Sequence, residues 1–173
     1  MTPGIVETFN GMPVHYIDAP EALEAAAAGW LQRDVVALDT EFMRVRTFHA
    51  QAALFQVCDG DACFLVDPLA VGDLAPLARL LDARDVLKVM HSCSEDLEVC
   101  DRHLGALPDP LVDTQIVAAF CGYPLSVGYQ KMLAAEFDVQ LGKSETRTDW
   151  LQRPLSPAQI HYAAEDVAFL PAL

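Results

Sequence analysis

Two carboxylates follow an unbroken apolar run in the stretch from Val35 to Phe42, which reads VVALDTEF. An apolar run of this length predicts a strand covered on both faces, in the interior of a sheet. Residues two apart on a strand point to the same side, so Asp39 and Glu41 present their carboxylates to one region. Crowded carboxylates repel each other unless a proton or cation lies between them, and a hard divalent metal ion is the simplest partner. The alternative is that the two acids only end a strand in a polar loop.

A third acid, Asp96, follows the apolar run from Val86 to Met90, which predicts another short buried strand. Ser92 and Glu95 have the spacing of a capping box, which places Asp96 in the first turn of a helix leaving the sheet. The alternative is that Asp96 only interacts with the positive end of the helix dipole, a contribution of about 0.3 to 1 kcal/mol. Strand ends and helix starts of this kind are, however, where open α/β sheets build their sites.

A fourth acid stands on the last helix that the sequence predicts. Ser156 is expected as its N-cap, with proline at the first helical position and Gln159 three residues after the cap. On this helix Tyr162 and Asp166 are four residues apart and share one face. The alternative is a packing tyrosine and a surface acid.

The elements that must position these acids form a mixed α/β pattern. Asp59-Gly60-Asp61 separates the apolar runs Ala52–Cys58 and Ala62–Val66, which predicts a hairpin. The sheet is therefore expected to begin as three consecutive antiparallel strands, the first being the run that starts at Val35. Further expected elements are an edge strand over Met12–Ile17, a helix over Pro20–Leu31 capped by Asp18, helices over Leu74–Asp82, Gln115–Cys121 and Gly128–Phe137, and a short strand over Pro110–Val112.

The bulk composition predicts one soluble domain. The chain has 173 residues, of which 53% are hydrophobic, enough for a sizeable core. No apolar stretch approaches the roughly 20 residues that cross a bilayer, and the first residues lack a secretory signal, so we expect a cytoplasmic protein without membrane contact. The five cysteines have no C-x-x-C spacing and lie among apolar residues, which favours buried reduced thiols over a zinc site or a disulfide framework.

The formal net charge of −14 argues against nucleic-acid binding by bulk electrostatics, because phosphate neutralisation needs Lys and Arg. It does not exclude a nuclease, since metal ions would cancel part of a carboxylate cluster. The basic residues fall into two groups, Arg44 with Arg46 and, later, Lys143, Arg147 and Arg153. The alternative for each group is a solvated loop.

Taken together, these motifs resemble the ribonuclease D family, within the DEDD group of 3′-to-5′ exonucleases and its tyrosine subclass. The resemblance spans roughly residues 35–170. It rests on LDTEF followed by Arg44 and Arg46, HSCSEDLEV from His91, DTQ and AAFCG from Asp113 and Ala118, KS through TDW from Lys143, and YAAED from Tyr162. Three acidic motifs in this order, the last as Tyr-x-x-x-Asp, are a far more specific signal than a lone Asp-x-Glu.

The resemblance implies an RNase H-like mixed sheet flanked by helices and a site that binds two divalent ions, Mg²⁺ or Mn²⁺. Asp39 would bridge the two ions, Glu41 and Asp166 would bind the ion that generates hydroxide, and Asp96 would anchor the second ion. Tyr162 would orient the attacking water, because a phenol with a pKa near 10 is a poor base at neutral pH. The residues expected to bind substrate are Thr40, Phe42, His91, Lys143 and Arg147.

The function expected from the resemblance is a 3′-to-5′ exoribonuclease that releases nucleoside 5′-monophosphates from RNA 3′ ends, such as those of tRNA precursors, with no evident protein partner. A proofreading-type DNA exonuclease and a catalytically silent nucleic-acid-binding module are the alternatives. The sequence departs from the family at Phe48-His49-Ala50, where Tyr-Pro is expected. We interpret residues 1–173 as one exonuclease domain, with the helical HRDC-type domains that the resemblance would add after it absent or truncated. The chain is then expected to be either an isolated catalytic fragment or a naturally short relative.

Overall fold

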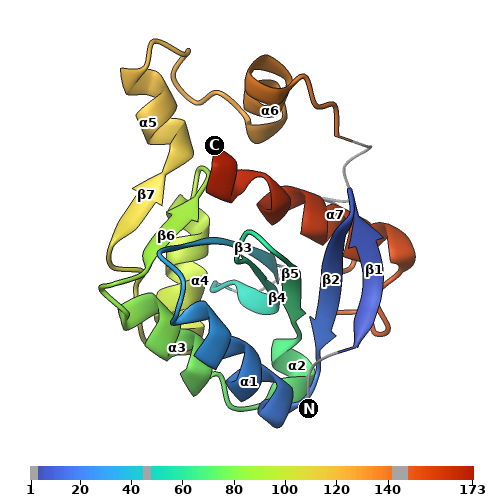
Figure 1. Ribbon diagram of the computed structural model, residues 1–173. Coiled ribbons are helices and arrows are strands. Elements are labelled where there is room, and N and C mark those ends of the chain that lie inside the picture. Colours follow the sequence, from blue (N-terminus) through green and yellow to red (C-terminus); the bar gives the residue numbers. More distant parts are fainter. Residues whose placement is uncertain (1–3, 45–47, 142–147) are drawn as a thin grey trace.

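The computed structural model describes residues 4–44, 48–141 and 148–173, which form a mixed sheet covered by helices on both faces (Figure 1). The seven strands lie in the order β1-β2-β5-β4-β3-β6-β7. Their bounds are β1 Ile5–Phe9, β2 Met12–Ile17, β3 Val35–Met43, β4 Gln51–Cys58, β5 Cys63–Val66, β6 Leu87–Met90 and β7 Leu111–Asp113. The strand that carries Asp39 and Glu41 is β3, and it is interior, as the sequence predicts.

The first three strands of the expected sheet pair as predicted. β3 is antiparallel to β4, and β4 is antiparallel to β5. Gly60, in the turn between β4 and β5, has a φ of +88°, and the Asp59 carboxylate accepts hydrogen bonds from the backbone N–H groups of Asp61 and Ala62. β6 and β7 then add in parallel beyond β3.

The expectation that Met12–Ile17 is an edge strand is wrong. β1 lies outside it, and β2 is paired on its other side with β5 in parallel. Asn10-Gly11 connects β1 to β2 with both residues at positive φ, which is the hairpin signal of a type I′ turn. The hydrophobic pattern did not predict β1, whose apolar residues Ile5 and Val6 are exposed.

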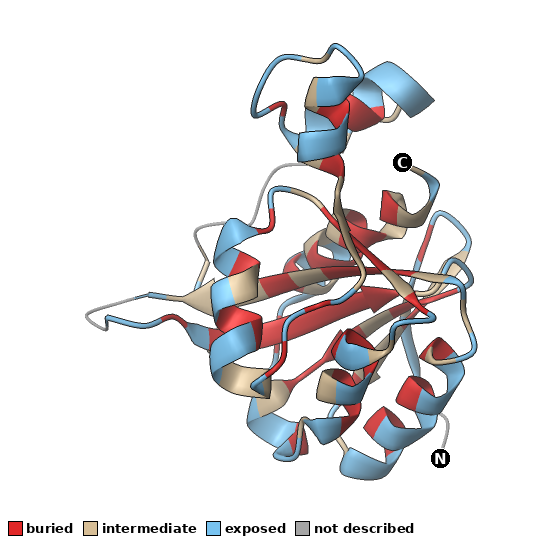
Figure 2. Ribbon diagram, turned by 90° about the vertical axis from the view of Figure 1, so that its left-hand side faces the viewer, coloured by how far each residue is buried: buried red, intermediate tan, exposed pale blue. Residues whose placement is uncertain are grey.

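Two hydrophobic clusters cover the two faces of the sheet, and buried residues follow the strands between them (Figure 2). Helices α1, α3 and α4 pack on one face, whereas α7 packs on the other and contacts β1, β3, β4 and β5. The helix bounds are α1 Pro20–Trp30, α2 Pro68–Val71, α3 Ala75–Asp82, α4 Ser94–Leu104, α5 Thr114–Phe120, α6 Tyr129–Phe137, α7 Pro157–Ala168 and the short η1 Leu170–Ala172.

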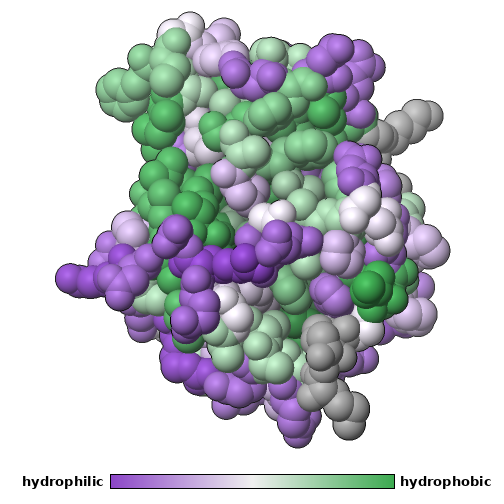
Figure 3. Space-filling view, in the orientation of Figure 1, coloured by the Kyte–Doolittle hydropathy of each residue, from purple (hydrophilic) through white to green (hydrophobic). Residues whose placement is uncertain are grey.

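Helices α5 and α6 form a small lobe that rises above the sheet (Figures 1 and 2). Its own core is the small cluster of Ala118, Val127 and Met132. Apolar side chains remain exposed on α5 and the loop after it, with Phe120 88% and Leu125 85% exposed, and Figure 3 shows hydrophobic surface over this part of the molecule.

Two predicted helix caps are wrong and one is confirmed. The N-cap of α1 is Ala19 rather than Asp18, with proline at the first helical position, and the N-cap of α4 is Cys93 rather than Ser92. Ser156 caps α7 as predicted, and Gln159 completes the capping box.

The cysteines are free, and four of them are buried as expected, whereas Cys121 is exposed. No helix in the described ranges is long and apolar enough to span a membrane.

Candidate active site

The end of β3 is where the candidate site forms, because β3 extends beyond its parallel neighbour. Only Val35 to Ala37 pair with β6, whereas the pairing with β4 continues to Met43. Asp39 and Glu41 therefore lie beyond the end of β6, on the face of β3 that also carries Ala37. The ladder with β4 shifts register between Glu41 and Phe42, as at a β-bulge.

Asp96 reaches this point because α4 begins shortly after β6. It is a buried carboxylate, 8% exposed, in the first turn of α4. The Thr40 hydroxyl, on the opposite face of β3 from Asp39, donates a hydrogen bond of 2.5 Å to Asp96 Oδ1. This contact ties the helix to the strand.

The start of α4 is held by a residue from another strand. The Asp113 carboxylate, at the end of β7, accepts hydrogen bonds of 2.9 Å and 3.0 Å from the backbone N–H groups of Ser92 and Cys93. Ser92 itself has a φ of +58° and does not cap the helix. The Ser92 N–H group, which Glu95 would have satisfied in the predicted capping box, is thus satisfied by a carboxylate distant in sequence, as is the N–H group of Cys93. These hydrogen bonds outweigh the effect of burial and hold the pKa of Asp113 below its ordinary value.

Helix α7 brings the last two predicted residues to the site. Its inner face consists of small apolar residues, with Ala163, Ala164 and Val167 fully buried, so the helix lies close against the sheet. Asp166 is half-buried, and a hydrogen bond from Tyr162 lowers its pKa, although burial and neighbouring acids outweigh that effect. The two residues share a face, as the sequence predicts.

The electrostatics show that the four acids lie close together. Burial is the largest cause that raises the pKa of Asp39 well above its ordinary value, followed by the charges of Asp96, Asp166 and Glu41. Burial and the charges of Asp166 and Asp96 raise the pKa of Glu41 to about 9. The pKa of Asp166 rises to about 7, chiefly through burial, and burial also raises that of Asp96. Four carboxylates from three separated segments therefore share one electrostatic environment.

The chemistry of this donor set fits hard divalent cations. All four side chains offer oxygen ligands, and a cation would relieve the repulsion that raises their pKa values. In the described ranges, however, no three Asp, Glu, His or Cys side chains converge closely enough to hold a metal ion as they stand. The four residues suit divalent ions because they offer oxygen ligands, carry negative charge and lie near one another. Their side chains would have to turn toward a cation to bind it.

Three of the predicted substrate-binding residues have internal contacts. Thr40 is buried beside Asp96, and Phe42 is half-buried against the hydrophobic cluster on the α4 face. His91 Nδ1 lies 2.8 Å from the Thr114 hydroxyl and Nε2 lies 3.1 Å from the Val127 carbonyl oxygen, and burial lowers the pKa of this imidazole.

The other predicted basic groups differ in their surroundings. Lys143, Arg147 and Arg46 lie outside the described residues. Arg44 is exposed and pairs with Glu98 at 2.9 Å. Arg153 does not belong to a solvated basic group. Its guanidinium donates two hydrogen bonds to the buried Asp67 carboxylate and further ones to the carbonyl oxygens of Ala53 and Trp150, which is a structural role.

Two residues near the acids had not been singled out from the sequence. The hydroxyl of Tyr129, on α6, donates to the Glu165 carbonyl oxygen at 3.2 Å, and burial together with the charges of Asp166 and Asp39 raises its pKa. No sequence pattern links α6 to the acids.

The second residue is Gln56, on β4, which is fully buried and directly opposite Asp39. Its signal is visible in the sequence, as a polar residue inside the apolar run Ala52–Cys58.

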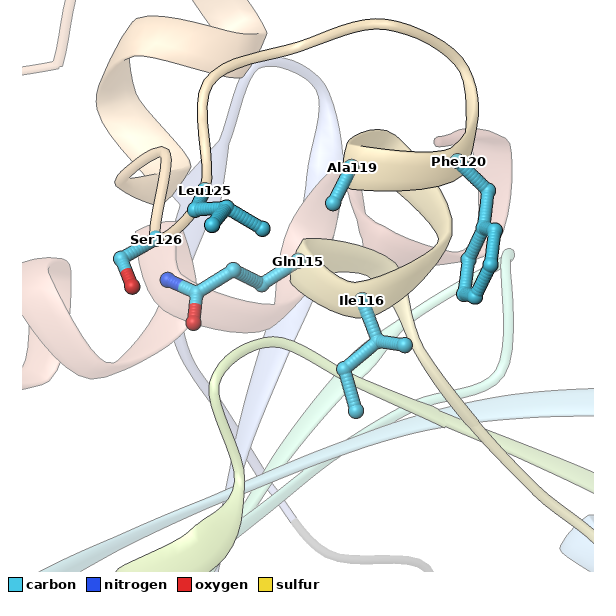
Figure 4. A pocket seen from close by; sticks show the side chains of 6 residues that line it. All are labelled: Gln115, Ile116, Ala119, Phe120, Leu125 and Ser126. Atoms are coloured by element: carbon cyan, nitrogen blue, oxygen red, sulfur yellow. The ribbon is translucent and has the colours of Figure 1, made fainter.

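An apolar cavity lies away from the four carboxylates. A cavity of about 450 Å³ lies on α5 and the loop after it, lined by Gln115, Ile116, Ala119, Phe120, Leu125 and Ser126 (Figure 4). None of the four carboxylates lines it. The chemistry of the site thus depends on the charged edge of the sheet and not on this apolar cavity.

An acidic cluster at the end of an interior strand, with a Tyr-x-x-x-Asp helix beside it, agrees with the resemblance to the DEDD 3′-to-5′ exonucleases. Residues 14–173 match the 3′-5′ exonuclease family, and the chain belongs to that family.

The similar curated relatives are named Ribonuclease D. The protein of Pseudomonas paraeruginosa is 49% identical over 157 residues, which are 91% of this chain and 42% of that protein. The protein of Escherichia coli is 45% identical over 159 residues, which are 92% of this chain and 42% of that protein. The chain thus spans less than half the length of these relatives.

Solved structures confirm the predicted fold class. The crystal structure of Escherichia coli RNase D superposes with a TM-score of 0.90 at 45% identity, over 93% of this chain and 43% of that one. The catalytic core of RRP6 from Trypanosoma brucei superposes with a TM-score of 0.87 at 25% identity, over 98% of this chain and 47% of that one. The mixed sheet with helices on both faces is therefore the RNase H-like fold of the DEDD exonucleases.

Proposed function

We propose that this chain is the catalytic domain of a 3′-to-5′ exoribonuclease that hydrolyses phosphodiester bonds with two divalent metal ions, Mg²⁺ or Mn²⁺. It would remove nucleoside 5′-monophosphates from RNA 3′ ends, tRNA precursors among them, in the cytoplasm. We treat residues 1–173 as one such domain. The observation that carries the proposal is the proximity of four acids, since the charges of Glu41, Asp96 and Asp166 all raise the pKa of Asp39.

The comparisons support the proposal at the level of the family. The Escherichia coli protein is described as an exoribonuclease involved in structured RNA processing. A further neighbour, NrnC of Brucella melitensis, has a structure with bound Mg²⁺ and superposes with a TM-score of 0.75 at 27% identity, over 92% of this chain and 76% of that one. Both statements describe those proteins, and their extension to this chain is part of the proposal.

Each of the four acids has a proposed role in holding the ions. Asp39, on the interior strand, would be shared by both ions, Glu41 and Asp166 would hold one of them, and Asp96 the other. When bound, the ions supply charge neutralisation at the phosphate, activation of water and assistance to the departing 3′ oxygen. Tyr162 hydrogen-bonds Asp166 and would orient the attacking water, because a phenol is a donor at neutral pH and a poor base.

The charge of the chain sets an expectation for RNA binding. With a formal net charge of −14, this segment alone should bind RNA weakly, and the binding should weaken further as salt rises. Tight binding of single-stranded RNA at physiological salt would contradict this expectation. Lys143 and Arg147 are proposed to contact backbone phosphates.

The test is a time course on 5′-labelled single-stranded RNA with Mg²⁺, Mn²⁺ or EDTA. The expected result is a ladder that shortens one nucleotide at a time and is absent in EDTA. Asp39→Asn and Asp96→Asn should abolish it, and Tyr162→Phe should slow it. Asp101→Asn is the matched control, because Asp101 is an exposed acid on the same helix as Asp96. Equal loss in Asp101→Asn would mean that any lost charge on α4 has the same effect.

A DNA strand of the same sequence, run in competition, tests the choice of substrate. Preferential degradation of the DNA would identify a proofreading-type exonuclease and refute the RNA assignment. RNA that stays intact with every metal but is retained on the protein, with retention lost in Lys143→Ala or Arg147→Ala, would identify a binding module.

A further inference from the structure

Gln56 is a buried amide with no hydrogen-bond partner in the described part of the chain. Its side chain is 0% exposed, and neither Nε2 nor Oε1 is bonded. Buried amides in folded proteins are nearly always hydrogen-bonded, because leaving one unpaired costs the desolvation of its polar atoms. The flanking residues of β4 are apolar, so a leucine at this position would avoid that cost. An amide at this position therefore indicates that it hydrogen-bonds a further group when the protein is functioning.

The register of the sheet places this amide beside the proposed site. Gln56 is directly opposite Asp39 in the antiparallel β3–β4 ladder, with Leu54 opposite Glu41. Directly opposite residues point to the same face, with Cβ atoms about 4.5 to 5.5 Å apart, within reach of a glutamine side chain. That face is the one covered by α7, where Ala163 and Ala164 are fully buried.

We propose that Gln56 is a positioning residue for Asp39. Its Nε2–H group donates a hydrogen bond to the Asp39 carboxylate, directly or through one water, when the carboxylate is ionised and holds a cation. The bond fixes the rotation of the carboxylate and so the direction of its remaining lone pairs. This role rests on the proposed function, because it presupposes a cation at Asp39.

An amide suits this task better than the other residue types. It donates without carrying a charge, so it does not compete with the cation as Lys or Arg would, and it does not titrate. Partners behind metal ligands orient those ligands, and losing one typically lowers metal affinity by about 10- to 100-fold. Because Gln56 is fully buried, it cannot contact RNA, and the KM for RNA should not change.

The test compares Gln56→Met with wild type. Methionine keeps the unbranched shape and removes both polar atoms. Titration of the metal-free protein with Mn²⁺ should show about 10- to 100-fold weaker binding, whereas the thermal midpoint in EDTA should stay equal or rise. RNA cleavage should fall at limiting Mn²⁺ and recover as Mn²⁺ is raised. Leu65→Met is the matched control, because Leu65 is fully buried and directly opposite Gln56 on β5.

Each outcome decides the proposal. Unchanged Mn²⁺ affinity in Gln56→Met, or an equal loss in Leu65→Met, overturns the role of Gln56 while leaving the proposed function intact. Wild-type protein that neither binds Mn²⁺ nor cleaves overturns the proposed function itself.

A second measurement does not depend on a folded Gln56→Met protein. The side-chain amide signals of Gln56 in wild type, assigned by selective labelling, should shift when Mg²⁺ is added. Signals that stay unchanged at saturating Mg²⁺ overturn the proposal.

Discussion

Replacing Glu41 by glutamine should stabilise the metal-free protein. Burial and the charges of Asp166 and Asp96 raise the pKa of Glu41 from 4.5 to about 9. Between these values the folded protein retains a proton that the unfolded chain has released. Stability is therefore lost as pH rises through this window, and the loss is largest at and above pH 9. A glutamine side chain at this position carries no charge at any pH and would avoid the loss.

The magnitude follows from the size of the displacement. Each pH unit above 4.5 costs about 1.4 kcal/mol of folding stability as long as Glu41 stays protonated in the folded protein. At pH 7 the raised pKa would therefore cost on the order of 3 kcal/mol. Glu41 is half-buried rather than fully enclosed, and its acidic neighbours titrate with it. Both effects reduce the cost, and we expect about 1 to 2 kcal/mol at pH 7. For a chain of this length that corresponds to a rise in Tm of about 2 to 8 °C.

The assay is thermal unfolding in EDTA across pH 5 to 9. The Tm of Glu41→Gln minus that of wild type should be small at pH 5 and should grow with pH. Added Mg²⁺ should raise the Tm of wild type more than that of the variant, because the variant lacks a ligand. Asp101→Asn, an exposed acid, is the control and should show no such trend. A variant less stable than wild type at pH 8 in EDTA, or a difference independent of pH, would refute the reasoning.

Three further substitutions test hydrogen bonds that hold the fold or the site. Thr40→Val removes the hydrogen bond to Asp96 while keeping the side-chain shape, and single-turnover cleavage should slow by about 10-fold, consistent with the loss of one charge-assisted hydrogen bond; an unchanged rate would contradict this. Arg153→Ala leaves the Asp67 carboxylate buried without its charged partner, and urea unfolding should show a loss of about 3 kcal/mol. Asp113→Ala releases two backbone N–H groups before α4, and both stability, by about 1 to 3 kcal/mol, and cleavage should fall. Loss of stability in Asp113→Ala without loss of cleavage would show that these hydrogen bonds stabilise the fold but are not needed to position the site.

The parts of the fold that local chemistry dictates could be predicted from the sequence. The interior position of β3 follows from its apolar run, and the β4–β5 hairpin follows from Asp59-Gly60-Asp61. The side chains of Ser156 and Gln159 each accept a hydrogen bond from the backbone N–H group of the other residue, within one helical turn. The start of α7 was therefore also predictable. In each case the interacting groups are close in sequence.

The parts that failed depend on groups distant in sequence. Ser92 has the right spacing for a capping box, yet the Asp113 carboxylate from β7 satisfies the backbone there, and no local pattern reveals that competitor. Arg153 follows a polar stretch that suggests a solvated group, and only the fold brings the buried Asp67 to it. The parallel pairing of β2 with β5 is likewise a long-range event.

The unequal lengths of neighbouring strands explain why the acids can meet at all. β3 has nine residues and β6 has four, so the last part of β3 has a sheet neighbour on its β4 side alone. On the open side, the chain turns from β6 directly into α4 and brings Asp96 to the strand. Across the face, the small residues of α7 allow Asp166 to approach. A longer β6 would pair with the β3 backbone at Asp39 and Glu41 and would delay the start of α4, which carries Asp96. The same arrangement that concentrates four charges therefore also leaves the backbone of β3 without a strand partner on its β6 side at Asp39 and Glu41.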